Sequence, residues 1–314
     1  MSNKAFSCFR DPGVWCKGNL HSHTTNSDGD CSPEEVVDWY CKNGYDFLAI
    51  TDHNVITDVS TLQKDGILVL PGIEFGYRTA EDPDYVLDML GINMKKLPDF
   101  LDPDHSGKVG DCKNVSPQRI IDEINRQDGI AVMCHPYYYA NLIAPYLRYH
   151  SYAGLEVYNF VCDELCGRAQ SEIYLDALLL RGAKLFAFAT DDSHEPDFGH
   201  AWIEVKAAEK TVPAILNAIR EGSFYATTGI KIFNVTYHDL VAEIEFDRPC
   251  DAVFMNSRSQ GMVKMRANTY KYVDGRMHYF ASYKLRGTER YLRVELRDKE
   301  GNKAYTNPIF LQEN

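Results

Sequence analysis

Hydrophobic residues fall into two different patterns along the chain. From Leu20 to about Gly222, short apolar runs alternate with stretches in which apolar residues recur at helical spacing. This alternation predicts an α/β domain with mostly parallel strands. Beyond it, apolar and polar positions alternate within short runs, which is typical of half-buried strands. We therefore predict two units, an α/β domain over 1–229 and a small β-sandwich-like domain over 230–314.

The ends of three helices are marked in the first part of the chain. Ser32, Pro33 and Glu35 combine an N-cap serine, a proline at the first helical position and a capping-box glutamate. A second helix begins at Ser116-Pro117 and ends at Gly129, and a third is predicted over 171–181. Strands are predicted over 45–50, 66–73, 85–94, 130–134, 154–159 and 183–190, and in the second part over 240–246 and 291–296.

Residues of the type that bind metals stand where these strands end. His21 and His23 are two positions apart at the end of an apparent strand, so their side chains share a face, and Asp28 lies on the following loop. Alone, this pair is weak evidence for a metal site, and paired structural histidines are the more ordinary interpretation. However, further strands lead to His53, Glu74, His135, Asp192 and His194. Because the carboxyl ends of parallel strands share one face, the set predicts a polynuclear metal site.

Charge and cysteine content narrow the possible partners. The formal charge is -12, with 45 acidic and 33 basic residues and no dense lysine or arginine run, which opposes binding to a nucleic acid polymer or an anionic membrane. The nine cysteines are odd in number and irregularly spaced, as expected for reduced thiols in the cytoplasm. Residues 1–10 lack the apolar core of a signal peptide, and no apolar run is long enough for a membrane helix. The oligomeric state cannot be inferred.

Taken together, the motifs resemble the PHP (polymerase and histidinol phosphatase) superfamily of metal-dependent phosphoesterases, over about 17–229. The residues that carry the resemblance are His21-Ser22-His23, Ser27-Asp28-Gly29, Thr51-Asp52-His53, Pro71-Gly72-Ile73-Glu74, His135-Pro136 and Asp192-Ser193-His194. The segments 224–229 and 301–309 resemble the carbaryl-hydrolase-like branch, which adds a small β-domain. The implied fold is a distorted (β/α)7 barrel of seven parallel strands with helices outside.

The resemblance also implies a ligand set for two or three divalent ions. The first ion would be held by His21, His23, Glu74 and Asp192, and the second by Asp28, His53 and His194. Glu74 would bridge to a third position served by His135. Relatives with three metals use another histidine between these two residues, and His105 is the only histidine in that interval here.

Imidazole and carboxylate ligands without a thiolate suit zinc, manganese or iron. Such ions lower the pKa of a bridging water from near 16 to about 7 and stabilise phosphoryl oxygens. The predicted function is hydrolysis of a small phosphorylated metabolite or nucleotide through a metal-bridging hydroxide. The alternatives are a carbamate, ester or amide hydrolase using the same site, and a noncatalytic metal-dependent binding protein.

Several single residues could have more than one role in the site. Asp28, His53 and His194 are the predicted catalytic residues, and His53 or His194 could act as a general acid if the second metal is absent. Asp52 is expected to orient a ligand or loop. For the substrate, the candidates are Arg78, Arg168 and His200, although either arginine could instead form a surface salt bridge. The tyrosines at 137–139 could line the site or pack a loop.

Overall fold

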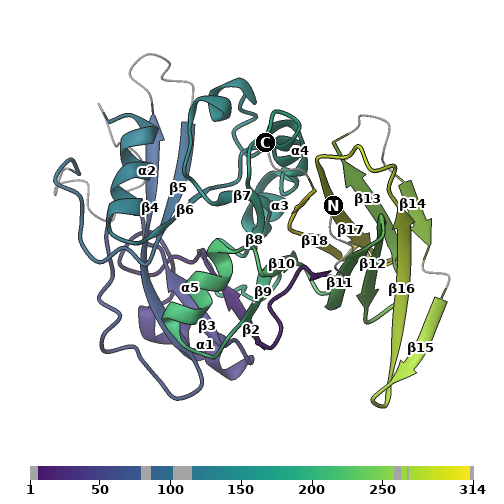
Figure 1. The fold of residues 1–314 in the computed structure, drawn as a ribbon. Helices are drawn as coiled ribbons and strands as arrows, with labels where there is room; N and C mark the ends of the chain where they lie inside the picture. Colours follow the sequence, from purple (N-terminus) through teal and green to yellow (C-terminus); the bar gives the residue numbers. More distant parts are fainter. Residues whose placement is uncertain (1–5, 79–85, 102–114, 258–262, 267–268, 312–314) are drawn as a thin grey trace.

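A computed structural model describes residues 6–78, 86–101, 115–257, 263–266 and 269–311. Its first part is a barrel of seven strands with helices on the outside (Figure 1). The strands are β2 (Val14–Asn19), β3 (Phe47–Ile50), β4 (Leu68–Arg78), β5 (Val86–Ile92), β6 (Ile130–Met133), β7 (Gly154–Asn159) and β8 (Phe186–Thr190). The helices are α1 (Pro33–Lys42), α2 (Pro117–Arg126), η2 (Ala144–Arg148), α3 (Phe160–Cys166), α4 (Glu172–Leu179) and α5 (Val212–Arg220). The predicted α/β fold is thus confirmed.

The barrel closes between its first and last strands. Ser22 and Ser193, just beyond β2 and β8, form a parallel bridge. On either side of it, the His23 amide donates to Ser193 O at 3.1 Å and the Asp192 amide donates to His21 O at 3.1 Å. Closure therefore brings the histidine pair next to Asp192, which lies about 170 residues away in the chain.

One strand departs from the expected parallel arrangement. β5 pairs antiparallel with both β4 and β6, whereas the other barrel neighbours pair in parallel. Only residues 79–85 separate β4 from β5, and a parallel crossover needs a dozen or more residues. The expectation of seven parallel strands was wrong for this strand. β4 is also longer than predicted and continues four residues past Glu74.

Local sequence accounts for the helix boundaries. The Ser32 side chain accepts a hydrogen bond from the Glu35 amide, and the Glu35 side chain accepts one from the Ser32 amide. These two bonds form the capping box at the start of α1. At the start of α2 the Ser116 side chain accepts from the Arg119 amide, and Ile120, Ile121 and Ile124 form the buried face of this helix. Among the described residues, no helix is long and apolar enough to cross a membrane.

The C-terminal part consists of two antiparallel layers around a second apolar core. One layer has the order β1-β11-β12-β16-β15, and the other contains β14, β13, β17 and β18. The strands not yet placed are β1 (Phe6–Ser7), β9 (Trp202–Ala207), β10 (Phe224–Thr227), β11 (Ile232–His238), β12 (Val241–Phe246), β13 (Asp251–Asn256), β14 (Val263–Arg266), β15 (Thr269–Val273), β16 (Arg276–Lys284), β17 (Tyr291–Arg297), β18 (Lys303–Thr306) and β19 (Ile309–Phe310).

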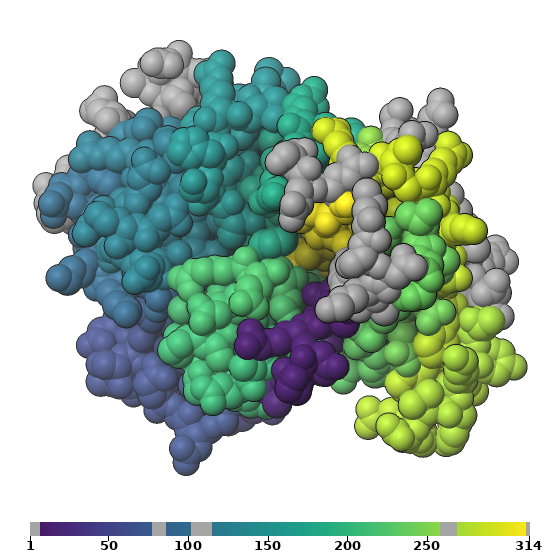
Figure 2. Space-filling model, viewed as in Figure 1, coloured from purple at the N-terminus to yellow at the C-terminus, as the bar shows by residue number. Residues whose placement is uncertain are grey.

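The two units share strands and core residues. β10 pairs with β9 on one side and with β18 on the other, so one sheet runs from the barrel into the C-terminal layer. The N-terminal strand β1 pairs with β11, and Phe9 packs in the C-terminal core. Figure 2 shows this N-terminal segment, in purple, lying between the barrel and the C-terminal unit. A division at 229/230 remains a prediction, with the N-terminus contributing to both sides of it.

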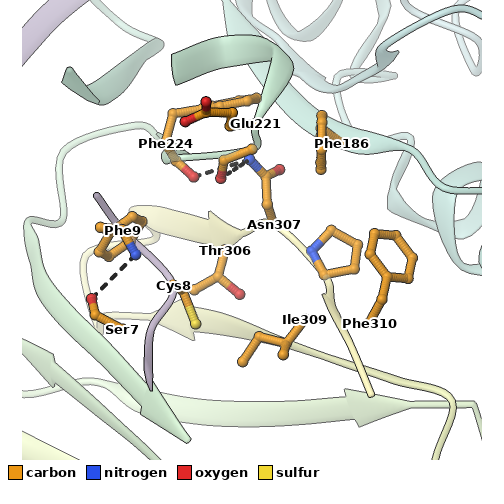
Figure 3. A pocket seen from close by; sticks show the side chains of 12 residues that line it. Ser7, Cys8, Phe9, Phe186, Glu221, Phe224, Thr306, Asn307, Ile309 and Phe310 are labelled. Atoms are coloured by element: carbon orange, nitrogen blue, oxygen red, sulfur yellow. Dashed lines mark hydrogen bonds between the residues drawn. The ribbon is translucent and has the colours of Figure 1, made fainter. Parts of the chain in front are cut away.

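A cavity of about 300 Å³ lies at this junction (Figure 3). Asn307 forms part of its wall. The Asn307 side chain accepts from the Ala187 amide at 2.9 Å and donates to Gly222 O at 3.1 Å and Phe224 O at 3.0 Å. The remaining wall is largely apolar, with Phe9, Phe186, Phe224, Ile309 and Phe310. None of the predicted metal ligands lines this cavity.

Candidate metal centre

Four buried side chains converge at the end of the barrel to form an inner cluster. His21 and His23 follow β2, Glu74 lies within β4, and Asp192 follows β8. His21 Nε2 lies 3.1 Å from Glu74 Oε2 and 3.0 Å from Asp192 Oδ1. His23 Nε2 lies 3.1 Å and 3.0 Å from the same two oxygens. Two imidazole nitrogens and two carboxylate oxygens thus face a common point, a donor set that suits a divalent transition metal.

An outer cluster stands beside the inner one and nearer to solvent. It joins Asp28, His53 and His194, with His23 shared between the two clusters. Asp28 Oδ2 lies 3.7 Å from His53 Nε2 and 3.5 Å from His194 Nε2. The side chains of Asp28 and His194 are 33% and 29% exposed, whereas those of His21 and His23 are fully buried. The outer cluster is therefore the open side of the centre.

Glu74 connects these groups to His135. Its Oε2 faces the histidines of the inner cluster and lies 3.3 Å from His53 Nδ1, while its Oε1 lies 3.4 Å from His135 Nε2. Glu74 Oε1, His53 Nδ1 and His135 Nδ1 are buried without a hydrogen-bond partner. Buried polar atoms normally have partners, so such atoms call for a bound group that the chain itself does not supply. Divalent ions fit at least the first two, because Glu74 Oε1 faces His135 and His53 Nδ1 faces Glu74 Oε2.

Glu156, which sequence reasoning passed over, orients two of the histidines. Its Oε1 accepts from His21 Nδ1 at 2.7 Å and its Oε2 accepts from the His135 amide at 2.9 Å. Asn159 donates to Glu156 at 2.8 Å and to Asp192 Oδ2 at 3.0 Å. With its Nδ1 proton held by Glu156, His21 presents Nε2 to the inner cluster. In the sequence, the sign of this role is an acidic residue in the middle of the mostly apolar strand 154–159.

Two further aspartates hold loops rather than joining the clusters. Asp52 accepts from the Thr24 amide at 2.7 Å and from Ser27 Oγ at 2.7 Å, which orders the loop that carries Asp28. Asp191 accepts from the Gly199, His200 and Ala201 amides, each at 2.8 Å. The geometry of Asp52 fits the orienting role expected for it.

Asp88 and Cys134 are additional buried groups that the sequence analysis did not single out. Asp88 Oδ2 lies 4.0 Å from His135 Nε2 and accepts from Tyr139 Oη at 2.6 Å. Burial and the nearby Glu74 raise the pKa of Asp88 to about 6. Cys134 groups with Glu74 and His135, so a thiol lies near the centre in addition to the predicted imidazole and carboxylate ligands. Burial raises the pKa of this thiol well above its usual value.

The clustered charges shift the pKa values of the histidines in the metal-free chain. Burial lowers the pKa of His23, but hydrogen bonds to Asp192 and Glu74 outweigh it and raise the pKa to about 10. His135 responds in the same way, to about 9. The pKa of His53 is instead lowered, chiefly by burial. In the metal-free chain the raised pKa values of His23 and His135 favour their charged forms, which offset the charge of the neighbouring carboxylates.

The backbone is constrained where the ligands sit. Asp192 has φ 56° and His135 has φ 24°, values that non-glycine residues rarely adopt. Such conformations persist where the surrounding structure enforces them, and they gather at functional sites. Here Glu156 accepts a hydrogen bond from the His135 amide, and Asn159 donates one to the Asp192 side chain. These bonds help to hold both residues in place.

Two of the predicted substrate residues, Arg168 and His200, do not join the clusters. Arg168 donates to Tyr138 O at 3.1 Å and lies over the Tyr137 ring at 5.7 Å, on an exposed surface. His200 stacks on Phe160 with ring centroids 3.7 Å apart and contacts Asp197. Arg78 ends β4, but its side chain lies outside the description, as does the whole of His105.

Fold and site together define the class: an α/β barrel with a candidate polynuclear metal centre and an appended all-β unit. Residues 19–167, just under half of the chain, match the family model of the PHP domain. The resemblance to the PHP superfamily is confirmed, whereas the carbaryl-hydrolase-like branch stays a prediction.

Two curated relatives match part of the chain. The DNA polymerase/3'-5' exonuclease PolX of Bacillus subtilis is 35% identical over 83 residues, which are 26% of this chain but only 14% of that protein. An uncharacterized protein of Methanocaldococcus jannaschii is 29% identical over 136 residues, 38% of this chain and 68% of its own length. What the much longer PolX does as a whole therefore says little about this chain.

One solved structure matches the whole architecture. It is a two-domain protein from Bacteroides vulgatus, described as containing a predicted PHP-like metal-dependent phosphoesterase. The match covers 96% of this chain and 97% of that chain, with a TM-score of 0.53 and 14% identity. At this identity the likeness shows a common fold, including the pairing of a PHP barrel with a second unit.

Proposed function

We propose that this chain is a metal-dependent phosphoesterase that hydrolyses a small phosphorylated metabolite or nucleotide. The observation that carries the proposal is the convergence of imidazole and carboxylate donors at one end of a PHP barrel, in two adjoining clusters. Neighbouring cation positions of this kind suit a phosphate group, which presents several anionic oxygens at once. The relatives named as phosphoesterase or exonuclease point to the same chemistry.

The residues present fit two ions, with room for a third. The inner ion would be held by His21, His23, Glu74 and Asp192, and the outer one by Asp28, His53 and His194. Glu74 Oε1 and His135 would form the start of a third position, and Asp88 and Cys134 are further buried donors beside it. We propose zinc, manganese or iron for these positions, because imidazole and carboxylate ligands suit all three.

When bound, such ions make water nucleophilic at neutral pH and stabilise charge on phosphoryl oxygens. The chain contributes orientation and proton control. Glu156 fixes the proton of His21 on Nδ1, and the Asp192 carbonyl accepts from His194 Nδ1 at 2.8 Å. His194 thereby directs Nε2 towards Asp28 at the open side. If the outer ion is absent, a protonated Nε2 there can supply a proton to the leaving oxygen.

The exposure of the two clusters supports approach of the substrate from the outer side. Asp28 and His194 are about one third exposed, whereas Glu74 and Asp192 are buried. The chain carries a net charge of -12, so it offers little general attraction to a long polyanion. A compact phosphate ester held mainly by bound cations fits these features better than a nucleic acid strand.

The test is phosphate release by protein reconstituted separately with Zn²⁺, Mn²⁺ and Fe²⁺, measured over a panel of phosphomonoesters and phosphodiesters. We expect turnover with at least one metal and substrate, abolished by a chelator and in Asp192→Ala. Absence of phosphate release with every metal would overturn the proposal. Aryl carbamates, carboxylic esters and amides belong in the same panel, and a clear preference for one of them would replace it.

A further inference from the structure

The C-terminal sheet meets the barrel with a buried polar face. Along β17, Leu292, Val294 and Leu296 point into the C-terminal apolar core. The alternate residues Arg293 and Glu295 therefore face the other way, and both are buried. Buried charges are rare unless they are paired. Glu295 pairs with Arg297 of the same strand at 2.6 Å, whereas Arg293 lies 3.7 Å from Glu295 and has its close partner outside the sheet. Figure 1 shows β17 and β18 next to α4 of the barrel.

Arg293 finds its partner on α4. Its Nε and Nη2 donate to the two oxygens of Asp176 at 2.7 Å and 2.6 Å. A two-pronged arginine–carboxylate pair fixes both distance and orientation. Arg293 Nη1, Glu295 Oε2 and Tyr305 Oη have no hydrogen-bond partner, although they are buried. The connection between sheet and helix is thus polar and directional rather than a smooth apolar contact.

Lys303, on the neighbouring strand β18, holds the residues just before and at the start of α4. Its ammonium donates to Gln170 Oε1 at 2.5 Å and to Glu172 Oε1 at 3.2 Å. The Lys303 side chain is only 12% exposed, so these contacts are poorly screened by solvent. Between the two partners stands Ser171, whose position is thereby fixed from both sides.

Ser171 in turn holds the segment that follows His135. Its Oγ accepts from the Tyr137 amide at 3.0 Å, and its own amide donates to Val157 O in β7 at 2.9 Å. One turn along α4, Tyr174 Oη donates to Asn141 O at 2.6 Å. The segment 135–141 is therefore attached at two points to the start of α4. This helix packs on β7 and β8 of the barrel and contacts the C-terminal sheet through Glu172 and Asp176.

We propose that Lys303 and Arg293 are positioning residues, through which the C-terminal sheet fixes segment 135–141 and so the ring of His135. The polar chain runs from Lys303 through Gln170 and Glu172 to Ser171 and then to Tyr137. Any role of His135 in hydrolysis rests on the proposed function, whereas the contacts that position His135 do not depend on it. The appended β-unit thereby helps to position one residue of the candidate centre.

The experiment is amide hydrogen exchange on the full metal-free chain, comparing wild type with Lys303→Gln. We expect exchange over 135–141 to become at least about tenfold faster, since local opening loses its restraint. Strand β3 serves as an internal reference and should be unchanged. Lys303→Arg, which keeps a cation at this position, should restore most of the protection. If Lys303→Gln does not fold, Glu172→Gln removes the other half of the same contact and carries the same expectation.

The matched control is Arg248→Gln. Arg248 is also a cation of the C-terminal unit, but it pairs with Asp247 at 2.9 Å and donates to Gly229 O at 2.7 Å without reaching α4. It should leave exchange over 135–141 at the wild-type rate. Unchanged exchange in Lys303→Gln, or equal acceleration in both variants, would overturn the proposal. Because no substrate or metal is used, a failed phosphoesterase assay would leave this result interpretable.

Discussion

The inner and outer clusters of the candidate centre differ in how the chain holds them. The inner one is buried and braced by Glu156 and Asn159, which bind its ligands at 2.7–3.0 Å. In the outer one, Asp28 sits on a loop and stands 3.5–3.7 Å from its neighbours. A braced cluster is ready to take up an ion, whereas a looser, more exposed one can exchange its contents with solvent and substrate. We therefore assign the inner position to tight binding and the outer one to access.

Removing an inner carboxylate should have the largest effect. Asp192→Ala should lose at least one equivalent of metal and reduce turnover by about 10³-fold or more, since bound cations stabilise the transition state by several kcal/mol. Elemental analysis and phosphate release check this. The control is Asp197→Ala, an exposed acid five residues further on, which should keep both. Full metal content in Asp192→Ala would contradict the inner assignment.

Removing the outer carboxylate should separate the two positions. Asp28→Ala should lose one equivalent of metal and retain the inner one, with turnover reduced about 10²-fold by loss of one electrostatic contribution. Metal titration followed by calorimetry distinguishes one binding event from two. Loss of both ions in this variant would show that the two clusters do not bind their ions independently, contrary to the separate roles assigned to them.

The hydrogen bonds that hold the inner cluster can be weakened without removing a metal ligand. Glu156→Gln should weaken inner metal binding by about 10- to 100-fold, because a neutral amide holds the His21 ring and its proton less firmly. The outer position should be nearly unaffected, as Glu156 has no contact with it. The measurement is competition with a chelator of known affinity, and Glu243→Gln on the exposed face of β12 is the control. Equal weakening of both positions would argue against a brace specific to the inner cluster.

The two positions should also differ in proton release. In the metal-free chain the pKa of His21 is raised well above its usual value and that of His23 to about 10, so both must lose a proton before binding an ion at pH 7.5. Outer His53 has a lowered pKa and is already neutral, while that of His194 is raised. Inner affinity should rise by about tenfold per pH unit for each proton released, below pH 9.

Calorimetry in two buffers of different ionisation enthalpy counts these protons. We expect close to two for the inner event and at most one for the outer. No proton release in the inner event would mean that its histidines are neutral before metal arrives, contrary to the pKa directions given above.

Much of the centre could be predicted from sequence because its ligands are attached to strand ends. His21, His23, His53 and Asp192 follow apolar runs, and a barrel brings such ends together whatever its details. The direction of β5 could not be read in this way, because a run such as 86–92 is equally apolar in either orientation. Its antiparallel course comes from the short connection to β4.

Groups that act through other residues were the hardest to foresee. Glu156 and Asp88 look like isolated acids within apolar strands, and only closure of the barrel shows which histidines they face. The same holds for Arg293 and Lys303, whose partners on α4 lie more than 100 residues away in the chain. The alternation of apolar and polar residues in 291–296 is typical of a half-buried strand, but the structure buries its polar residues Arg293 and Glu295 as well.

The most direct test of the account is a crystal structure of manganese-loaded protein with anomalous difference maps measured at the metal edge. We expect one strong peak between His21, His23, Glu74 and Asp192, and a second, weaker one beside Asp28, His53 and His194. A map without a peak among the inner four residues, in protein that elemental analysis shows to contain manganese, would contradict the central claim.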